Sequence, residues 1–182
     1  GVKAMLRPVL TLADTAHSII GTRNMTALAK GFRSVSGNSI PLWTWAMPKA
    51  YTPKATGLLK SEVKVVYFPS CLNQTMGTAH SSPDHTPLVD KTVALLEKAG
   101  YEVIFPSNMN KLCCGTIWES KGMPEIADRK AAELEEALYI ATENGRYPVL
   151  CDQSPCLYRM RNTMKSVKLY EPAEFILTFL CD

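Results

Sequence analysis

The stretch that decides the fold is residues 63–68, VKVVYF, which leads directly into PSC at residues 69–71. Its β-branched and aromatic residues are typical of a mostly buried strand. Three later stretches have the same character: YEVIF at 101–105, YPVLC at 147–151 and the short VKLY at 167–170. Four strands are therefore expected in the second part of the chain.

Helical patterns separate and follow these strands. One begins at Thr86-Pro87, with Thr86 as the expected N-cap, and stops at Gly100. The others begin at Pro124, at Ser154-Pro155 with Ser154 as the expected cap, and at Pro172. Strand–helix alternation of this kind predicts a parallel sheet with right-handed crossovers. The expected fold class is α/β, a three-layer Rossmann-like domain with a mostly parallel four-stranded sheet, preceded by a helical N-terminal segment.

The first 60 residues differ from the rest in charge. They contain eight Lys and Arg residues against one acid, Asp14, a net charge of +7, whereas the rest has 12 basic and 16 acidic residues, a net of −4. Two helices are expected there, over about 4–20 and 24–34, with Asn24 as the N-cap of the second. We expect residues 1–60 to be a basic helical segment and linker, and residues 61–182 a cysteine-rich α/β domain. The positive charge with Trp43 and Trp45 could engage anionic lipid; docking against another domain is the preferred interpretation.

Composition limits the class of protein. The chain has 182 residues, 46% of them apolar and 20% charged, with six cysteines. A chain of this size buries a core without covalent staples, and no secretory signal or long apolar run is evident. A cytoplasmic location is expected, with peripheral contact on the inner face of the membrane as an added alternative. No nucleic-acid-binding motif is present.

Four cysteines, Cys71, Cys113, Cys114 and Cys156, follow three successive strands and are called the cysteine quartet below. Forty-one residues separate Cys71 from Cys113, and forty-one separate Cys114 from Cys156. Because the carboxyl ends of parallel strands share one edge of the sheet, the quartet is predicted to converge. Cys156 lies near a helix N-terminus, which favours the metal-binding thiolate. Four cysteines are the usual ligand set of an iron–sulfur cluster.

Other interpretations of the cysteines are open. The quartet could bind a structural zinc ion, with His80 or His85 as a further ligand, or catalyse thiol–disulfide exchange. His17 has no predicted role. Cysteines can also be small buried apolar residues. That interpretation is preferred for Cys151 and Cys181.

Four motifs carry a family resemblance: YFPSC at 67–71, LLEKAGYEV at 95–103, LCCG at 112–115 and DQSPC at 152–156. Together they resemble the cysteine-rich CCG domain of the heterodisulfide reductase B type. The DQSPC ending and the basic N-terminal segment are most similar to the C-terminal iron–sulfur region of FAD-linked oxidases related to D-lactate dehydrogenase (cytochrome). Gln153 stands where the heterodisulfide reductase pattern has a cysteine, and one CCG repeat is present instead of two.

The resemblance implies an electron-transfer module with a cluster of the 4Fe-4S type, ligated by the cysteine quartet, with Gly115 also in the cofactor site. No residue is predicted to be catalytic, and the fragment alone is expected to have no turnover and to be prone to losing its cluster. The implied partners are the flavin and ferredoxin-like domains of a longer parent protein, a second CCG repeat, and quinone or another acceptor. FAD would be bound by the parent protein, which would oxidise a 2-hydroxy acid such as D-lactate.

Overall fold

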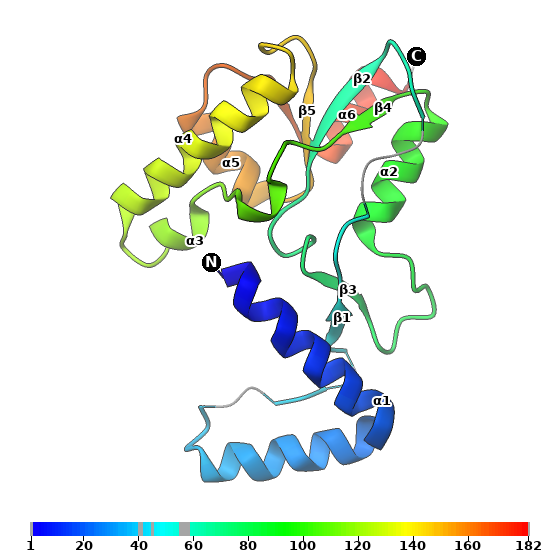
Figure 1. Ribbon diagram of the computed structural model, residues 1–182, viewed down its shortest axis with the longest axis vertical. Helices are drawn as coiled ribbons and strands as arrows, with labels where there is room; N and C mark the ends of the chain where they lie inside the picture. The colour runs from blue at the N-terminus through cyan, green and yellow to red at the C-terminus, as the bar shows by residue number, and fades with distance from the viewer. Residues whose placement is uncertain (1, 40–41, 45, 55–58, 182) are drawn as a thin grey trace. The chain divides into compact units, whose positions relative to one another are not determined.

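Figure 1 presents a computed structural model of the chain, which describes residues 2–39, 42–44, 46–54 and 59–181. The chain divides into two compact units. The first contains residues 1–52 and 75–88, and the second contains residues 53–74 and 89–182. Residues 75–88 thus pack with the N-terminal unit although they follow the first strand of the α/β sheet.

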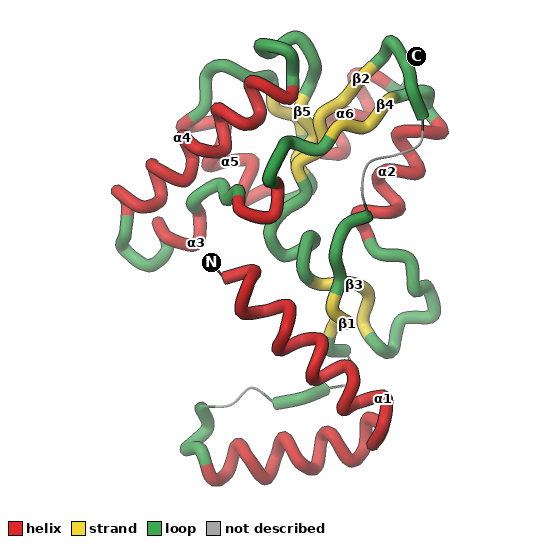
Figure 2. The backbone as a smooth tube through the Cα atoms, viewed as in Figure 1, coloured by secondary structure: helices red, strands yellow, loops and turns green. Residues whose placement is uncertain are grey.

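The second unit is built on a four-stranded sheet in the order β4-β2-β5-β6 (Figure 2). Each neighbouring pair of strands is parallel. The expected α/β fold with a parallel sheet is therefore confirmed. The strands are β2 (Lys64–Phe68), β4 (Glu102–Ile104), β5 (Val149–Cys151) and β6 (Leu169–Tyr170).

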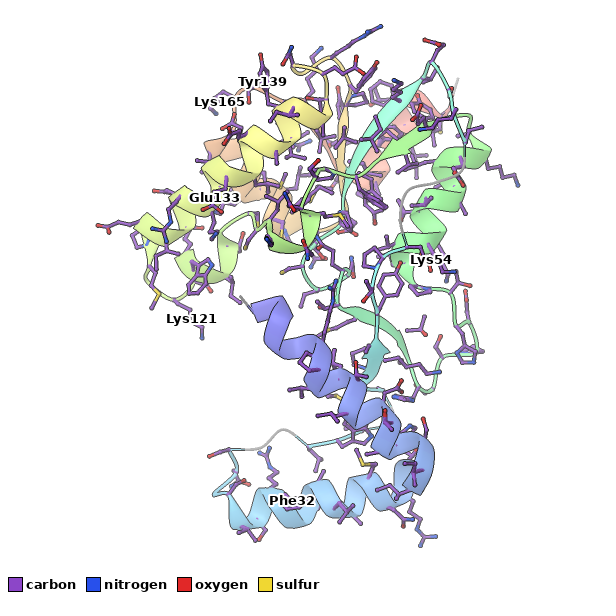
Figure 3. The ribbon with its side chains drawn as sticks, in the orientation of Figure 1. Phe32, Lys54, Lys121, Glu133, Tyr139 and Lys165 are labelled. Atoms are coloured by element: carbon purple, nitrogen blue, oxygen red, sulfur yellow. The ribbon has the colours of Figure 1, made fainter. Side chains whose placement is uncertain are left out.

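Helices cover both faces of this sheet, which makes the three layers visible in Figure 1. Helices α4 (Pro124–Ala141) and α5 (Ser154–Thr163) lie on one face, and α2 (Leu88–Lys98) and α6 (Pro172–Phe179) lie on the other. Successive side chains of a strand point to opposite faces. Val66 and Phe68 of β2 accordingly join Val149 and Cys151 of β5 in the core beneath α4 and α5. The outer surface of α4 carries Glu133 and Tyr139 (Figure 3).

The first unit contains the long helix α1 (Val2–Val35), which is kinked at Gly21. Gly21 has φ 74° and ψ 165°, a conformation that is open almost only to glycine. The two predicted helices are present, but the break falls at Gly21, and the prediction of Asn24 as an N-cap is wrong. Asn24 lies inside the second half and donates its side-chain amide to the Ile20 carbonyl at 2.9 Å.

A small antiparallel pair, β1 (Pro48–Ala50) and β3 (Met76–Ala79), completes the first unit. Both strands lie where linker and loop were expected. Pro48 pairs with Ala79 and Ala50 with Met76, so the partners are 31 and 26 positions apart in the chain. The glycine-containing segment of β3 has no hydrophobic run and forms a strand through this distant partner.

Two short elements lie in the expected loop between β4 and α4. They are the 3-10 helix η1 (Met109–Lys111) and the one-turn helix α3 (Thr116–Glu119). At the next strand end, α5 begins at Ser154 and its N-cap is Gln153, which corrects the predicted cap by one residue. Cys156 is consequently the third residue of that helix.

Candidate functional site

Three neighbouring strands carry the cysteine quartet at their carboxyl ends. Cys71 comes three residues after β2. The Cys113–Cys114 pair comes after β4 and η1 and is separated from α3 by Gly115, and Cys156 lies in the first turn of α5 after β5. Strand β2 lies between β4 and β5, so the three strand ends are adjacent at one edge of the sheet.

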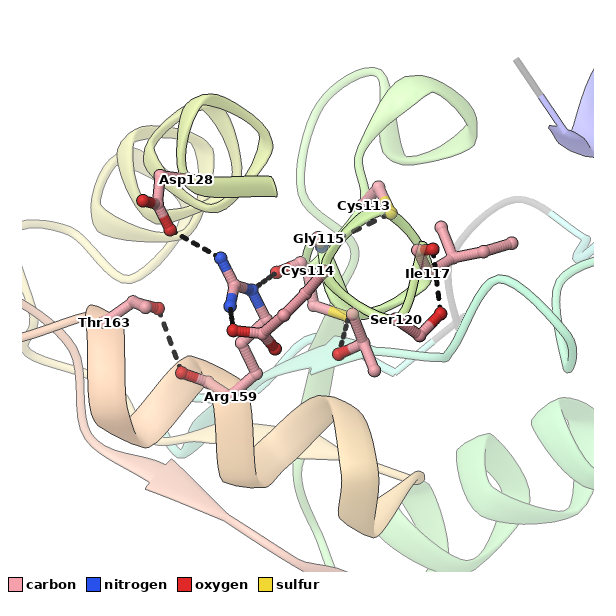
Figure 4. Close-up of polar contacts among 10 residues, drawn as sticks. Cys113, Cys114, Gly115, Ile117, Ser120, Asp128, Arg159 and Thr163 are labelled. Carbon is pink, nitrogen blue, oxygen red and sulfur yellow. Dashed lines mark hydrogen bonds and ion pairs between the residues drawn. The ribbon is translucent and has the colours of Figure 1, made fainter. Parts of the chain in front are cut away.

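The turn that bears Cys113 and Cys114 is fixed by Gly115 (Figure 4). Gly115 has φ +93°, and its amide donates to Sγ of Cys113 at 3.4 Å. A Cβ at this position would lie 2.3 Å from the Ala127 carbonyl oxygen in α4. Glycine is required both for the left-handed backbone and for this close approach to α4.

The thiols of the quartet influence one another's protonation. The pKa of Cys114 is lowered to about 2, because hydrogen bonds from Cys113 and then Cys156 favour its thiolate; Thr116, with Oγ1 3.2 Å from Sγ, adds to this. The pKa values of Cys113 and Cys156 are raised, first by their hydrogen bonds to Cys114 and then by burial. The charge of Cys71 raises both further. These shifts favour the thiolate at Cys114 and the protonated thiol at Cys113 and Cys156.

The sulfur group extends from the core to the surface. Cys114, Cys151 and Cys156 are buried, whereas Cys71 and Cys113 are partly exposed. All six cysteines are thiols. Cys181 is exposed, so the prediction that it packs as a small apolar residue is wrong.

Arg159, in α5, connects the Cys113–Cys114 turn to three helices. Its Nε donates to the Cys114 carbonyl at 3.1 Å, and its terminal nitrogens pair with Glu119 of α3 and Asp128 of α4, the latter at 2.6 Å (Figure 4). The Arg159 side chain is 6% exposed, and both carboxylates lie toward solvent. A planar guanidinium with several donors is suited to holding three groups at fixed angles.

Asp152 makes the equivalent connection for the Cys71 turn. Its Oδ1 accepts from the Ser70 amide at 2.8 Å, and its Oδ2 accepts from the Tyr67 hydroxyl at 2.7 Å. Burial, followed by the charge of Asp152, raises the pKa of Tyr67 above its ordinary value, so that this phenol remains a hydrogen-bond donor. The end of β5 is thereby joined to the segment that leads into Cys71.

A family model described as "Cysteine-rich domain", CCG, matches residues 65–161, more than half of the chain. The chain belongs to the CCG cysteine-rich domain family. The matched CCG segment begins in β2 and ends in α5, so it contains the whole quartet, Arg159 and Asp152. Comparisons with curated proteins and with solved structures returned no match.

The quartet of this CCG domain offers the type of ligand atom, cysteine sulfur, that binds iron–sulfur clusters. Thiolates are the ligands that such clusters use, and one cysteine of the quartet already favours the thiolate. Among the described residues, no three His, Cys, Asp or Glu side chains are arranged to hold a metal ion. The assignment of the quartet as ligands stays a prediction.

The histidines and tryptophans that were considered at the sequence level have other surroundings. His80 packs its ring against His17, with centroids 4.0 Å apart, and its Nε2 lies 3.1 Å from Asp14. Trp43 is buried beside both rings, so it offers no surface for lipid. Trp45 lies outside the described residues. No helix in the described part of the chain is both long enough and apolar enough to cross a membrane.

Sequence reasoning missed Arg159 and gave Asp152 no role of its own. The Arg159 contact to Cys114 spans 45 positions and the Asp152 contact to Tyr67 spans 85, so neither has a local pattern. Asp152 does stand within the DQSPC motif, and a carboxylate next to a strand end could have been recognised as an anchor for a neighbouring turn.

Proposed function

We propose that this CCG domain is an electron-transfer module whose cysteine quartet holds an iron–sulfur cluster. One observation carries the proposal: four thiols that are far apart in sequence follow three adjacent strand ends at one edge of the sheet. Adjacent cysteines at 113 and 114, with thiols also from two separate elements, favour a polynuclear centre over a zinc knuckle, whose ligands are usually spaced by two or more residues.

The protein's own groups have separate roles in this proposal. The quartet would supply the thiolate ligands, and a bound cluster would accept and release single electrons. Gly115 sets the direction of the Cys113–Cys114 turn, and its amide donates to Sγ of Cys113. Such N–H donors to sulfur, together with burial, are among the features by which a protein sets the reduction potential of a cluster.

We further propose that the domain works within a flavin-linked oxidoreductase that acts on a 2-hydroxy acid such as D-lactate. The similarity of the Ser-Pro-Cys ending at 154–156 and of the basic N-terminal segment to that group of oxidases supports this context. Electrons would arrive from a flavin domain and ferredoxin-like domain and pass to quinone or another acceptor. In this proposal the described chain would supply the cysteine ligands of the cluster that relays electrons. Oxidation of the substrate would require the flavin domain.

Anaerobic reconstitution of the full chain with iron and sulfide tests the proposal. We expect stoichiometric iron and acid-labile sulfide, visible charge-transfer absorption, and an EPR signal in the oxidised or reduced state. Cys114→Ser should abolish these signals, and Cys181→Ser, at an exposed position, should leave them unchanged. Wild-type protein that takes up zinc and no iron would refute the proposal.

Thiol–disulfide chemistry is a second candidate, because Cys114 favours the thiolate and Cys113 and Cys156 hydrogen-bond to it. However, the reactive thiolate is buried, whereas exchange requires access to the attacking sulfur. An insulin-reduction assay discriminates. Activity in the metal-free chain that disappears in Cys114→Ser would favour this candidate over electron transfer.

A further inference from the structure

The second half of α1, residues 22–35, contributes no residue to a buried core. The structure describes all of these residues, and none of them is buried. Short helices are marginally stable in water, and in proteins most of their stability comes from packing an apolar face. Thr22, Asn24 and Gly31 lower the helix propensity of the segment further. A further source of stability is therefore expected for this helix.

Three apolar side chains line one face of this helix and lie toward solvent. Leu28, Phe32 and Val35 are spaced at i, i+4 and i+7, so they share one face, and they are called the apolar stripe below. Their exposed fractions are 49%, 63% and 89%. Figure 3 labels Phe32 on this helix. The face that would normally pack against a core is thus available to a partner.

The opposite side of the helix carries positive charge. Arg23 and Lys30 are exposed and lie about 140–160° around the helix axis from Leu28. Residues 15–61 contain six Lys and Arg residues and no Asp or Glu. A charged helix face that meets only water usually mixes both signs. An apolar face opposite cations of a single sign is typical of a helix that lies on a membrane surface.

We propose that residues 22–35 bind the surface of a membrane that contains anionic lipid. The apolar stripe would enter the boundary between headgroups and acyl chains, with the helix parallel to the membrane plane. A helix is about 10–12 Å across, so Arg23 and Lys30 remain about one Debye length from the headgroups and attract them. A nucleic acid would match the cations and leave the apolar stripe exposed, whereas an anionic bilayer matches both. This surface does not include the buried Trp43, and the inference is independent of the proposed cluster.

Co-sedimentation of the full chain with vesicles tests the inference. The vesicles contain phosphatidylcholine alone or with about one third phosphatidylglycerol, and binding to the anionic vesicles should be about tenfold stronger or more. Phe32→Gln should weaken that binding about tenfold or more, and Lys30→Gln about two- to fivefold. Leu177→Gln and Lys121→Gln, at exposed positions in the second unit, are the matched controls and should bind as the wild type does.

Three results of this assay would overturn the inference. They are equal binding to the two kinds of vesicle, wild-type binding by Phe32→Gln, and no binding to either vesicle. The last result would favour an acidic protein surface as the partner of this helix. Because the substituted positions are exposed, the variants are expected to fold, and circular dichroism verifies this.

Hydrogen exchange locates the contact on the unsubstituted chain. Amides of residues 22–35 should exchange rapidly in water, because no core covers this helix, and about tenfold or more slowly when anionic vesicles are added. Amides of α2 and α4 serve as the internal reference and should not change. Protection that appears elsewhere in the chain and not in residues 22–35 would overturn the inference.

Discussion

Replacing Gly115 with alanine tests whether close backbone approach fixes the Cys113–Cys114 turn. The substitution has two costs. An L-residue at φ +93° loses about 1–2 kcal/mol, part of which is offset because alanine restricts the unfolded chain. The new Cβ would also lie 2.3 Å from the Ala127 carbonyl oxygen and 2.9 Å from Nε of Arg159, an overlap that backbone atoms must shift to relieve. Overpacking of this kind costs about 1–3 kcal/mol.

Gly122 provides a matched control. It also has a positive φ, +72°, but no atom lies within 4 Å of a Cβ placed there. Gly122→Ala should therefore lower the free energy of unfolding by about 1 kcal/mol or less, and Gly115→Ala by about 2–4 kcal/mol. Urea unfolding monitored by circular dichroism measures both. Equal losses in the two variants would refute the reasoning, because backbone conformation alone would then explain the requirement for glycine.

Three further predictions concern the groups around the site and the first unit. Arg159→Lys should lower the free energy of unfolding by about 1–3 kcal/mol, because lysine cannot make all the hydrogen bonds of the guanidinium group, including the one to the Cys114 carbonyl. Wild-type stability of the variant in urea would contradict this. Burial and the charge of Asp152 raise the pKa of Tyr67, so the neutral phenol contributes fully to stability below about pH 10 and this contribution is lost as pH rises. In Tyr67→Phe, the free energy of unfolding measured in urea should therefore fall less steeply with alkaline pH. The same dependence on pH in the variant and the wild type would contradict this. Burial and then the charge of His17 lower the pKa of His80, so the neutral imidazole contributes to stability above about pH 6.5 and this contribution is lost on acidification. His80→Phe should therefore lose less unfolding free energy than the wild type between about pH 7 and 5. Equal losses in the two proteins would contradict the prediction.

The fold was predictable where hydrophobic runs alternate with helical patterns. Strands β2, β4 and β5 and the helices between them follow from local signals, such as the VKVVYF run. The order β4-β2-β5-β6 does not follow, because each crossover helix can return the chain on either side of a strand. Strand β3 was missed because MGTA has a single β-branched residue, Thr78, and no aromatic residue, and its pairing depends on a distant segment.

The proximity of the quartet was also predictable, because it depends on the same alternation of strands and helices. The position of a cysteine after a parallel strand determines the edge at which it lies, so proximity of the quartet follows from topology. The hydrogen bonds between side chains and distant backbone groups were not predictable, because they depend on how the elements pack together. Arg159, for example, reaches a carbonyl 45 positions away. The interpretation of Cys151 as a core residue is confirmed, because this side chain is fully buried among the apolar residues beneath α4 and α5.

Three of the supporting contacts around the site use no cysteine side chain. Asp152 holds the Ser70 amide next to Cys71, Arg159 holds the Cys114 carbonyl, and the Gly115 backbone lies against α4. Each contact fixes one sulfur-bearing segment through groups that no cofactor would occupy. In small zinc domains, by contrast, the metal supplies the folding free energy and the metal-free chain is unfolded. The CCG domain also has a buried core of its own beneath α4 and α5, which contains Cys114 and Cys156. We therefore expect the cysteine-bearing segments to be ordered by folding, before any cluster binds.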